Sequence, residues 1–562
     1  MSIKDQVLNH SDPGKRSKPV ILEQQSTAFD DPPASYQDEV NGLLQAASVD
    51  DAYNRLINER DIRKIMIYPG FASGDIYAAG IAMKLDPKLN LVLLRFLGAG
   101  IIQGKNDKSL RDLNSSYLED VEFRANQPRD CTANTLPYLR QLLGGEFEQR
   151  VAIIDYDELA IHNSMRFWSS HWQDQAKERC LSELLKTILS NEFDKSKVSN
   201  EVNASVELVN KWLNPDKIAG KMPPYILVDL FYGTYYVGLQ KPDSVHQEAS
   251  NALTQNYNAD TVSTWLKAYF DNKKQAQQAY SPTGHFDLAP EARVLVYWSR
   301  FSGKRGGAHM EYDTGIHSIR QMLCLANSLG FDAVILAGDL PGSQYKVGST
   351  GGDIVKRQQK VADIVSASQT FHPHMTVLNL TEFWGDENWK STFKGRERIA
   401  QFWLYKYLSN QFKTVHLGNR SGNMENLALM GFCVGYLELF DDAGQDRMKQ
   451  FSPHGYQRIE IVLPSSRTGK EIVFSKWDES KTTLSTGHPN HNHYNRYNLD
   501  KATLASYRTL ADNPNNEALA CARKAKQTKL KEKYAKPDVE GIKKGFIWYD
   551  IKTIGDWLET QM

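Results

Sequence analysis

The chain has 562 residues with 67 basic and 67 acidic side chains, and 41% of its residues are apolar. This neutral balance excludes a protein that coats nucleic acid or an anionic membrane with its whole surface, because such surfaces are basic. Five scattered cysteines without a CxxC pair argue against a disulfide framework and fit a reducing compartment. The sequence shows neither an apolar leader nor an apolar stretch of bilayer length, so we expect a cytoplasmic protein with no membrane span.

The first 60 residues are polar and carry turn-forming dipeptides, which predicts a flexible arm with one helix near 36–47. Apolar strands then alternate with helices, and continuous apolar strands indicate a mostly parallel sheet that is covered on both faces. Polar helical stretches at 158–215 and 245–280 are predicted to be insertions. The predicted strands of this part are Ile65–Pro69, Leu89–Leu97, Val151–Asp155 and Tyr225–Leu230.

A turn cluster at 280–284 predicts a domain boundary, after which the alternation of strands and helices restarts. The predicted strands of the second part are 293–298, 333–338, 375–380, 413–417 and 432–439. Long amphipathic helices are expected at 315–329 and 398–412, and a last helix at 551–558. We therefore predict an α/β protein with two Rossmann-like domains and helical insertions. Its predicted parts are an arm at 1–60, domains at 61–284 and 285–480, and a helical extension at 481–562.

The strongest motif is LGNRSGNMENLALMG at 417–431, where a strand ends, glycines allow a tight turn and a helix begins. The unpaired N–H groups and partial positive charge of a helix N-terminus suit a phosphate. Glu425, in the first turn of this helix, could accept hydrogen bonds from ribose hydroxyls. The alternative is a plain strand–turn–helix in which Asn423 caps the helix and Glu425 favours its dipole.

This motif resembles the donor-binding element of GT-B glycosyltransferases, in which an SG-x-x-E-A-L-A-x-G-x-P-V-like stretch holds the nucleotide diphosphate and the ribose. The usual proline before the last strand is absent from 431–434. The resemblance implies two domains that face a cleft, with the acceptor bound by 61–284 and the donor by 285–480. The residues that it implies for donor contact are Ser421, Gly422, Asn423 and Glu425.

A second candidate site is the basic, glycine-rich loop SRFSGKRGG at 299–307, which directly follows a predicted strand. Cations between glycines can approach a diphosphate closely, and arginine can bind it bidentately. Within the GT-B resemblance, Arg300, Lys304 and Arg305 would stabilise the departing nucleoside diphosphate in place of a metal. A solvated basic loop is the alternative.

Transfer to an acceptor hydroxyl needs a general base. Asp75 and Asp229 follow predicted strands of the first domain, and His309 and Glu311 in the basic loop are rivals for the role. The residues predicted to line the acceptor side come from the loop after the first strand: Gly70, Ser73 and Gly74.

No metal or other cofactor is expected. The D-x-D pair at 155–157 is similar to the metal motif of GT-A glycosyltransferases, and the histidines at 488–493 resemble a metal-binding tract. The first pattern is also typical of the end of a strand, and the second of a solvated turn. Both are more simply explained in these ways.

These features predict a metal-independent transferase, of the glycosyltransferase type, that uses a nucleotide-activated sugar. One alternative is a transferase on the same scaffold that uses a non-sugar donor such as aminoacyl-tRNA, with RNA bound by the basic helix at 523–536. Another is a non-catalytic, nucleotide-binding pseudoenzyme.

Overall fold

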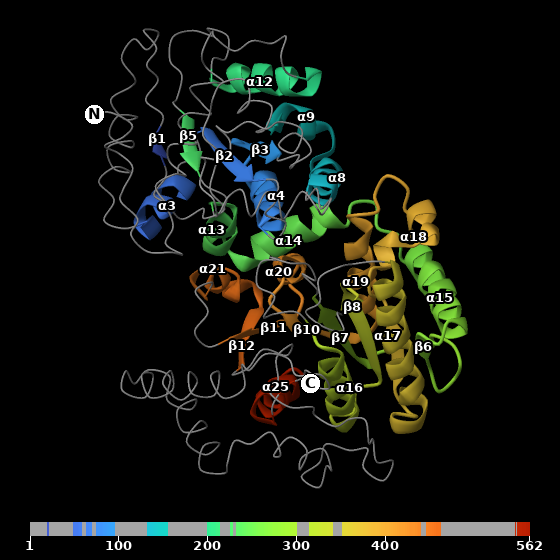
Figure 1. The fold of residues 1–562 in the computed structure, drawn as a ribbon. Helices are drawn as coiled ribbons and strands as arrows, with labels where there is room; N and C mark the ends of the chain where they lie inside the picture. Colours follow the sequence, from blue (N-terminus) through green and yellow to red (C-terminus); the bar gives the residue numbers. More distant parts are fainter. Residues whose placement is uncertain are drawn as a thin grey trace, which may run out of the picture. The chain divides into compact units, whose positions relative to one another are not determined.

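A computed structural model gives the fold of the chain (Figure 1). The residues that it describes are 20–21, 49–58, 63–69, 75–95, 132–155, 199–213, 225–228, 232–300, 314–340, 351–439, 445–461, 546 and 548–562. The predicted helices near 36–47 and at 523–536 lie outside these residues. The described helices include none that is long and apolar enough to cross a membrane.

The chain forms two compact units, each made of discontinuous segments. Unit 1 contains Met1–Leu253 and Ala443–His454, and unit 2 contains Thr254–Asp442 and Gly455–Met562. The division therefore lies ahead of the turn cluster at 280–284, where we predicted a boundary. The segment that precedes this turn belongs to unit 2 because its strand β6 (Ala279–Tyr280) pairs with a strand of that unit.

The sheet of unit 1 has the strand order β1-β5-β2-β3-β4. Strands β2 to β5 pair in parallel, and β1 is antiparallel to β5 at one edge. The chain runs outward from β2 to β4 and then returns to the other side of β2, so its direction reverses there. The strands are β1 (Val20–Ile21), β2 (Arg63–Pro69), β3 (Leu89–Arg95), β4 (Val151–Asp155) and β5 (Tyr225–Val228).

Helix α4 (Ile76–Leu85) is the central helix of unit 1, and its residues from Ile76 to Met83 are all buried. A helix that is apolar all round belongs inside a core. Its small residues allow α13 (Tyr232–Leu239) to approach closely, since a Cβ on Gly233 would lie 2.7 Å from Cα of Ala79. The other helical segments of unit 1 are α3 (Val49–Asn58), α8 (Thr132–Leu143), η1 (Gly144–Glu146), α9 (Phe147–Arg150), α12 (Asn200–Leu213), α14 (Pro242–Leu253), α21 (Gln445–Lys449) and η5 (Ser452–His454).

The sheet of unit 2 has the strand order β12-β11-β10-β7-β8-β9-β6. All its strands are parallel except β6, which is antiparallel to β9. The chain runs outward from β7 to β9, returns to β10 beside β7, and runs outward again to β12. The strands are β7 (Arg293–Ser299), β8 (Ala333–Gly338), β9 (Thr376–Asn379), β10 (Lys413–Asn419), β11 (Val434–Leu439) and β12 (Tyr456–Ile461).

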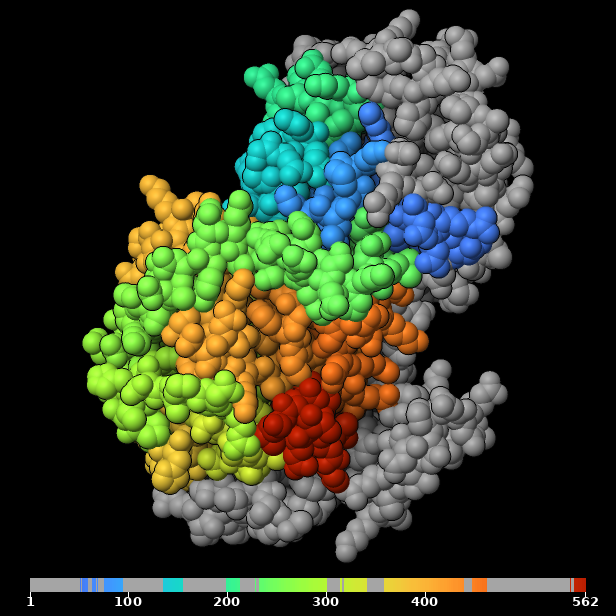
Figure 2. All heavy atoms as spheres, turned by 180° about the vertical axis from the view of Figure 1, so that it is seen from behind, coloured from blue at the N-terminus to red at the C-terminus, as the bar shows by residue number. Residues whose placement is uncertain are grey.

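Helices cover both faces of the unit 2 sheet. Successive side chains of a strand point to opposite faces, and on β7 Tyr297 and Trp298 mark the two sides. The face of Tyr297 packs against α16 (Ile316–Ser328), α17 (Gly351–Phe371) and α25 (Trp548–Thr560) in one continuous apolar core. Figure 2 shows α25 in red against the orange atoms of the same unit.

The face of Trp298 packs against an aromatic cluster. The ring centroids of Trp298 and Tyr405 are 5.0 Å apart, and those of Trp265 and Trp389 are 4.6 Å apart. The helical segments on this side are α15 (Ala259–Gln275), η4 (Phe383–Gly385), α18 (Glu387–Thr392), α19 (Ala400–Gln411) and α20 (Gly422–Leu429). The prediction of an α/β protein is therefore confirmed, with two mostly parallel sheets.

Candidate functional site

The candidate site lies in unit 2, at the carboxyl ends of β7 and β10. These strands are parallel neighbours, with Trp298 opposite Gly418, although about 120 residues separate them along the chain. They mark the point where the strand order reverses, and ligands of open α/β sheets bind outside the carboxyl ends of the strands at such a point. The predicted motifs at 299–307 and 417–431 both begin here.

Gly418 allows helix α20 to begin close to the sheet. A Cβ at this position would lie 2.5 Å from Cβ of Trp298, 2.7 Å from its carbonyl oxygen and 3.1 Å from Sδ of Met424. The helix begins at Gly422, and its N-cap is Ser421 rather than Asn423. The side chain of Ser421 makes no capping hydrogen bond, so it does not occupy the N–H groups of the first turn.

Thr314, to which no sequence motif points, links the ends of both strands. Its Oγ1 accepts a hydrogen bond from the backbone N–H of Arg300 (2.9 Å) and one from Nδ2 of Asn419 (3.3 Å). Its own N–H donates to the carbonyl oxygen of Arg300 over 2.7 Å. Nη1 of Arg300 donates to the carbonyl oxygen of Arg420 over 3.3 Å, which places this guanidinium beside the residue that precedes the N-cap of α20.

A buried ion cluster lies behind this edge. Glu438 on β11 is 0% exposed and accepts hydrogen bonds from Nη1 of Arg420 and from Nε of Arg458, each over 2.8 Å. The positive charge of Arg420 is therefore paired with Glu438 inside the protein. Sequence spacing alone gives no sign of this cluster, because the three residues come from the end of β10 and from β11 and β12.

Glu425, predicted to contact ribose, is 0% exposed in the structure. It lies near Tyr436, whose pKa is raised mainly by burial and further by the charges of Glu438 and Glu425. Ser421, Gly422 and Asn423 are partly exposed. The structure thus gives the predicted donor residues of this motif two different environments.

In unit 1, the candidate base Asp75 precedes α4 and forms an ion pair with Arg447 of α21. Its carboxylate therefore holds together two segments that are far apart in the sequence. The remaining predicted residues lie outside the described ranges: Gly70, Ser73, Gly74, Asp229, Lys304, Arg305 and His309.

Among the described residues, no group of three or more histidine, cysteine, aspartate or glutamate side chains is placed to hold a metal ion. The sequence matches no protein-family model and no curated protein. The GT-B resemblance therefore stays a prediction from the sequence motif.

Proposed function

We propose that unit 2 binds the diphosphate group of a nucleotide-activated donor at the carboxyl ends of β7 and β10, and that the protein is a transferase of the glycosyltransferase type. One observation carries the proposal. The guanidinium of Arg300 lies within 3.3 Å of the carbonyl oxygen of Arg420, one residue before the N-cap of α20. A fixed cation and a helix N-terminus therefore meet at one place.

These two features suit the same ligand. The N–H groups at the start of α20 can donate to phosphate oxygens, and the helix dipole favours negative charge there. Arg300 can bind a second phosphate bidentately and stabilise the charge that grows on a departing nucleoside diphosphate. The strand order of unit 2 supports the proposal further, because Rossmann-like doubly wound sheets bind nucleotides at this position.

The contacts that we propose are Arg300, Ser421, Gly422 and Asn423. Glu425 is left out, because a carboxylate that is 0% exposed would first have to leave the core to reach a ribose. We propose instead that Glu425 helps to hold α20 against the sheet.

A thermal-shift panel tests the proposal, since any ligand selective for the folded state raises the melting temperature. The panel contains nucleoside diphosphates, nucleotide sugars and, for the alternative donor, tRNA. At least one nucleoside diphosphate should stabilise the protein, and Arg300→Gln should weaken that ligand at least about tenfold by removing a charge-assisted hydrogen bond. Arg293→Gln is the matched control, because Arg293 lies at the opposite end of the same strand.

Each arm of the panel gives a distinct answer. Stabilisation of the parent protein by no nucleotide contradicts the proposal, as does equal stabilisation of the Arg300→Gln variant. Stabilisation by tRNA alone, lost as salt is raised, selects the aminoacyl-tRNA alternative. Nucleotide-sugar binding without hydrolysis or transfer in any acceptor mixture selects the pseudoenzyme.

A further inference from the structure

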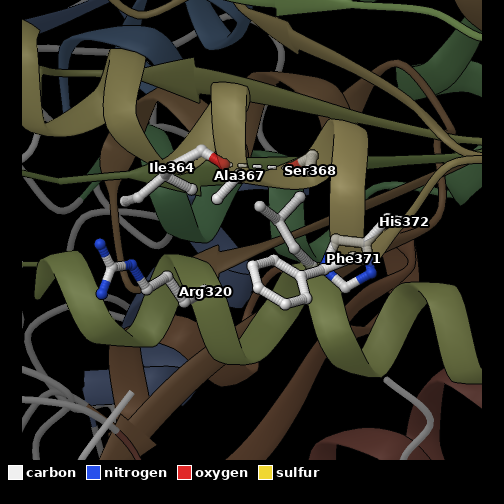
Figure 3. Close-up of a pocket in the computed structure, with 7 residues that line it drawn as sticks. Arg320, Ile364, Ala367, Ser368, Phe371 and His372 are labelled. Atoms are coloured by element: carbon white, nitrogen blue, oxygen red, sulfur yellow. Dashed lines mark hydrogen bonds between the residues drawn. The ribbon is translucent and has the colours of Figure 1, made fainter. Parts of the chain in front are cut away.

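A cavity of unit 2 lies between α16 and α17 and has a volume of about 130 Å³ (Figure 3). It belongs to the sheet face that packs against α16, α17 and α25, whereas α20 packs against Trp298 on the other face. The cavity is therefore separate from the proposed donor site. The residues that line the cavity are Arg320, Leu323, Ile364, Ala367, Ser368, Phe371 and His372.

Most of the lining is apolar. Leu323 comes from α16, and Ile364, Ala367 and Phe371 come from α17. An apolar cavity of roughly 150 Å³ holds a molecule the size of benzene. The volume and the lining therefore suit a six-membered ring or a short branched chain.

Arg320 supplies a positive charge at one end of this group of residues (Figure 3). Among the described residues, none forms a hydrogen bond or an ion pair with its guanidinium. The carboxylate of Asp363, whose charge acts on Arg320, accepts a hydrogen bond from Nε2 of Gln359 (3.0 Å) and forms no ion pair with Arg320. Burial lowers the pKa of Arg320, and Asp363 opposes that effect. Arg320 is partly buried, and a partly desolvated guanidinium without a hydrogen-bonded anion favours an anion beside it.

The other polar residues of the cavity do not compete with that charge. The hydroxyl of Ser368 donates to the carbonyl oxygen of Ile364 over 3.1 Å, shown as the dashed line in Figure 3, and its oxygen can still accept. Burial lowers the pKa of His372 to about 4, so this side chain is neutral at neutral pH. Arg320 is thus the only side chain among the lining residues that is charged at this pH.

We propose that this cavity binds a small organic monocarboxylate, with an aromatic or branched aliphatic body between α16 and α17 and its carboxylate on Arg320. The apolar wall would recognise the body and the guanidinium would recognise the charge by a bidentate pair. An inorganic anion would bind only the guanidinium, and a neutral aromatic compound would contact only the apolar wall.

Binding of benzoate to the full-length protein, measured by calorimetry, tests the proposal, with benzamide as the neutral ligand of the same shape. Benzoate should bind, and benzamide and inorganic phosphate should bind at least about tenfold more weakly, because each lacks one of the two recognised features. Arg320→Gln should weaken benzoate by a similar factor. Arg396→Gln, which alters an exposed arginine of the same unit, and Arg300→Gln should leave its affinity unchanged.

A second variant separates a lost site from a misfolded protein. Ala367→Leu keeps Arg320 and the helix but fills the cavity, so it should abolish benzoate binding without lowering the melting temperature of the ligand-free protein. The proposal is overturned if benzoate does not bind the parent protein, if benzamide binds equally well, or if either cavity variant binds benzoate like the parent.

Discussion

Nε1 of Trp298 donates a hydrogen bond to Nδ1 of His416 over 3.2 Å, between the neighbouring strands β7 and β10. A ring nitrogen that accepts a hydrogen bond carries no proton, so His416 is neutral with its proton on Nε2. The side chain is 0% exposed, and burial lowers its pKa from 6.5 to about 3. The strand ends that form the candidate site are thus held together by an uncharged histidine.

The first prediction is that His416 lowers the free energy of unfolding as the solution becomes acidic. Above pH 6.5 His416 is neutral in both states, and between pH 6.5 and about 3 only the unfolded chain binds the proton. Stability should therefore fall as the pH falls through this window, by up to about 1.4 kcal/mol per pH unit for one proton. His416→Asn keeps an acceptor for Trp298 but removes the titration, so it should lose less stability between about pH 7 and about pH 5. Urea denaturation at both pH values measures the difference.

His285→Asn provides the control, because it also replaces a histidine but at a side chain that is 77% exposed. His372 and His454, whose pKa values burial lowers to about 4, contribute to the pH dependence that remains. An equal loss of stability in His416→Asn and the parent protein would show that His416 is protonated in the folded state.

The second prediction concerns the close approach at Gly418. A Cβ there would lie 2.7 Å from the carbonyl oxygen of Trp298, a backbone atom that cannot move away easily. Gly418→Ala should therefore lower the free energy of unfolding by about 1–3 kcal/mol, measured by urea denaturation, and displace α20. Gly385→Ala, where a Cβ would meet nothing within 4 Å, is the control. Equal effects of the two substitutions would show that the close approach at Gly418 does not position α20.

The third prediction is that Glu438 stabilises the sheet through its two arginine partners. Glu438→Gln removes the negative charge and turns an amide N–H₂ group toward Arg420 or Arg458. Breaking a buried ion pair in this way costs about 3–5 kcal/mol, so the melting temperature should fall markedly. Glu387→Gln is the control, because Glu387 is 86% exposed in its pair with Lys390 and should change stability by no more than about 0.5 kcal/mol. A small effect of Glu438→Gln would mean that Arg420 and Arg458 do not depend on the negative charge of Glu438.

The fourth prediction concerns unit 1, where Arg150 closes the turn between α4 and β3. Its Nη2 donates to the carbonyl oxygens of Met83 (2.7 Å), Asp86 (2.7 Å) and Leu89 (2.8 Å). Arg150→Met removes one donor from each of these carbonyl oxygens and should cost at least about 3 kcal/mol of unfolding free energy. Arg140→Met, at an exposed position of α8, should cost much less. Hydrogen exchange at the start of β3 would show whether the loss is local.

Strands were predictable from the sequence where both faces are buried. The run VLVYW inside β7 and the run AVILAG of β8 are continuously apolar, and every residue of β8 is buried. Strand β12 was missed because polar side chains interrupt its apolar residues at the edge of the sheet, so YQRIEI lacks a continuous apolar run. The turn at 281–284 does form, with Gly284 at φ +79°, but turn chemistry does not reveal that β6 pairs with β9.

The candidate site was predictable in its local parts. Glycines, a cation and a helix start are all visible at 299–307 and 417–431, and the structure brings Arg300 and the start of α20 together. Thr314 and Glu438 were not predictable, because only the pairing of β7, β10 and β11 brings them beside these motifs. The burial of Glu425 likewise depends on how α20 packs, which one-dimensional spacing does not specify.

The chain passes from one unit to the other three times, at 253–254, 442–443 and 454–455. Neither unit is therefore one continuous stretch of the chain, and no single cleavage releases both units intact. A fragment that ends at Leu253 loses Arg447, the partner of Asp75, and His454, whose Nε2 lies 2.8 Å from the carbonyl oxygen of Val237. During synthesis, unit 1 must wait for about 190 further residues before its last segment emerges, so the first half of the protein finishes folding after most of the second has been made.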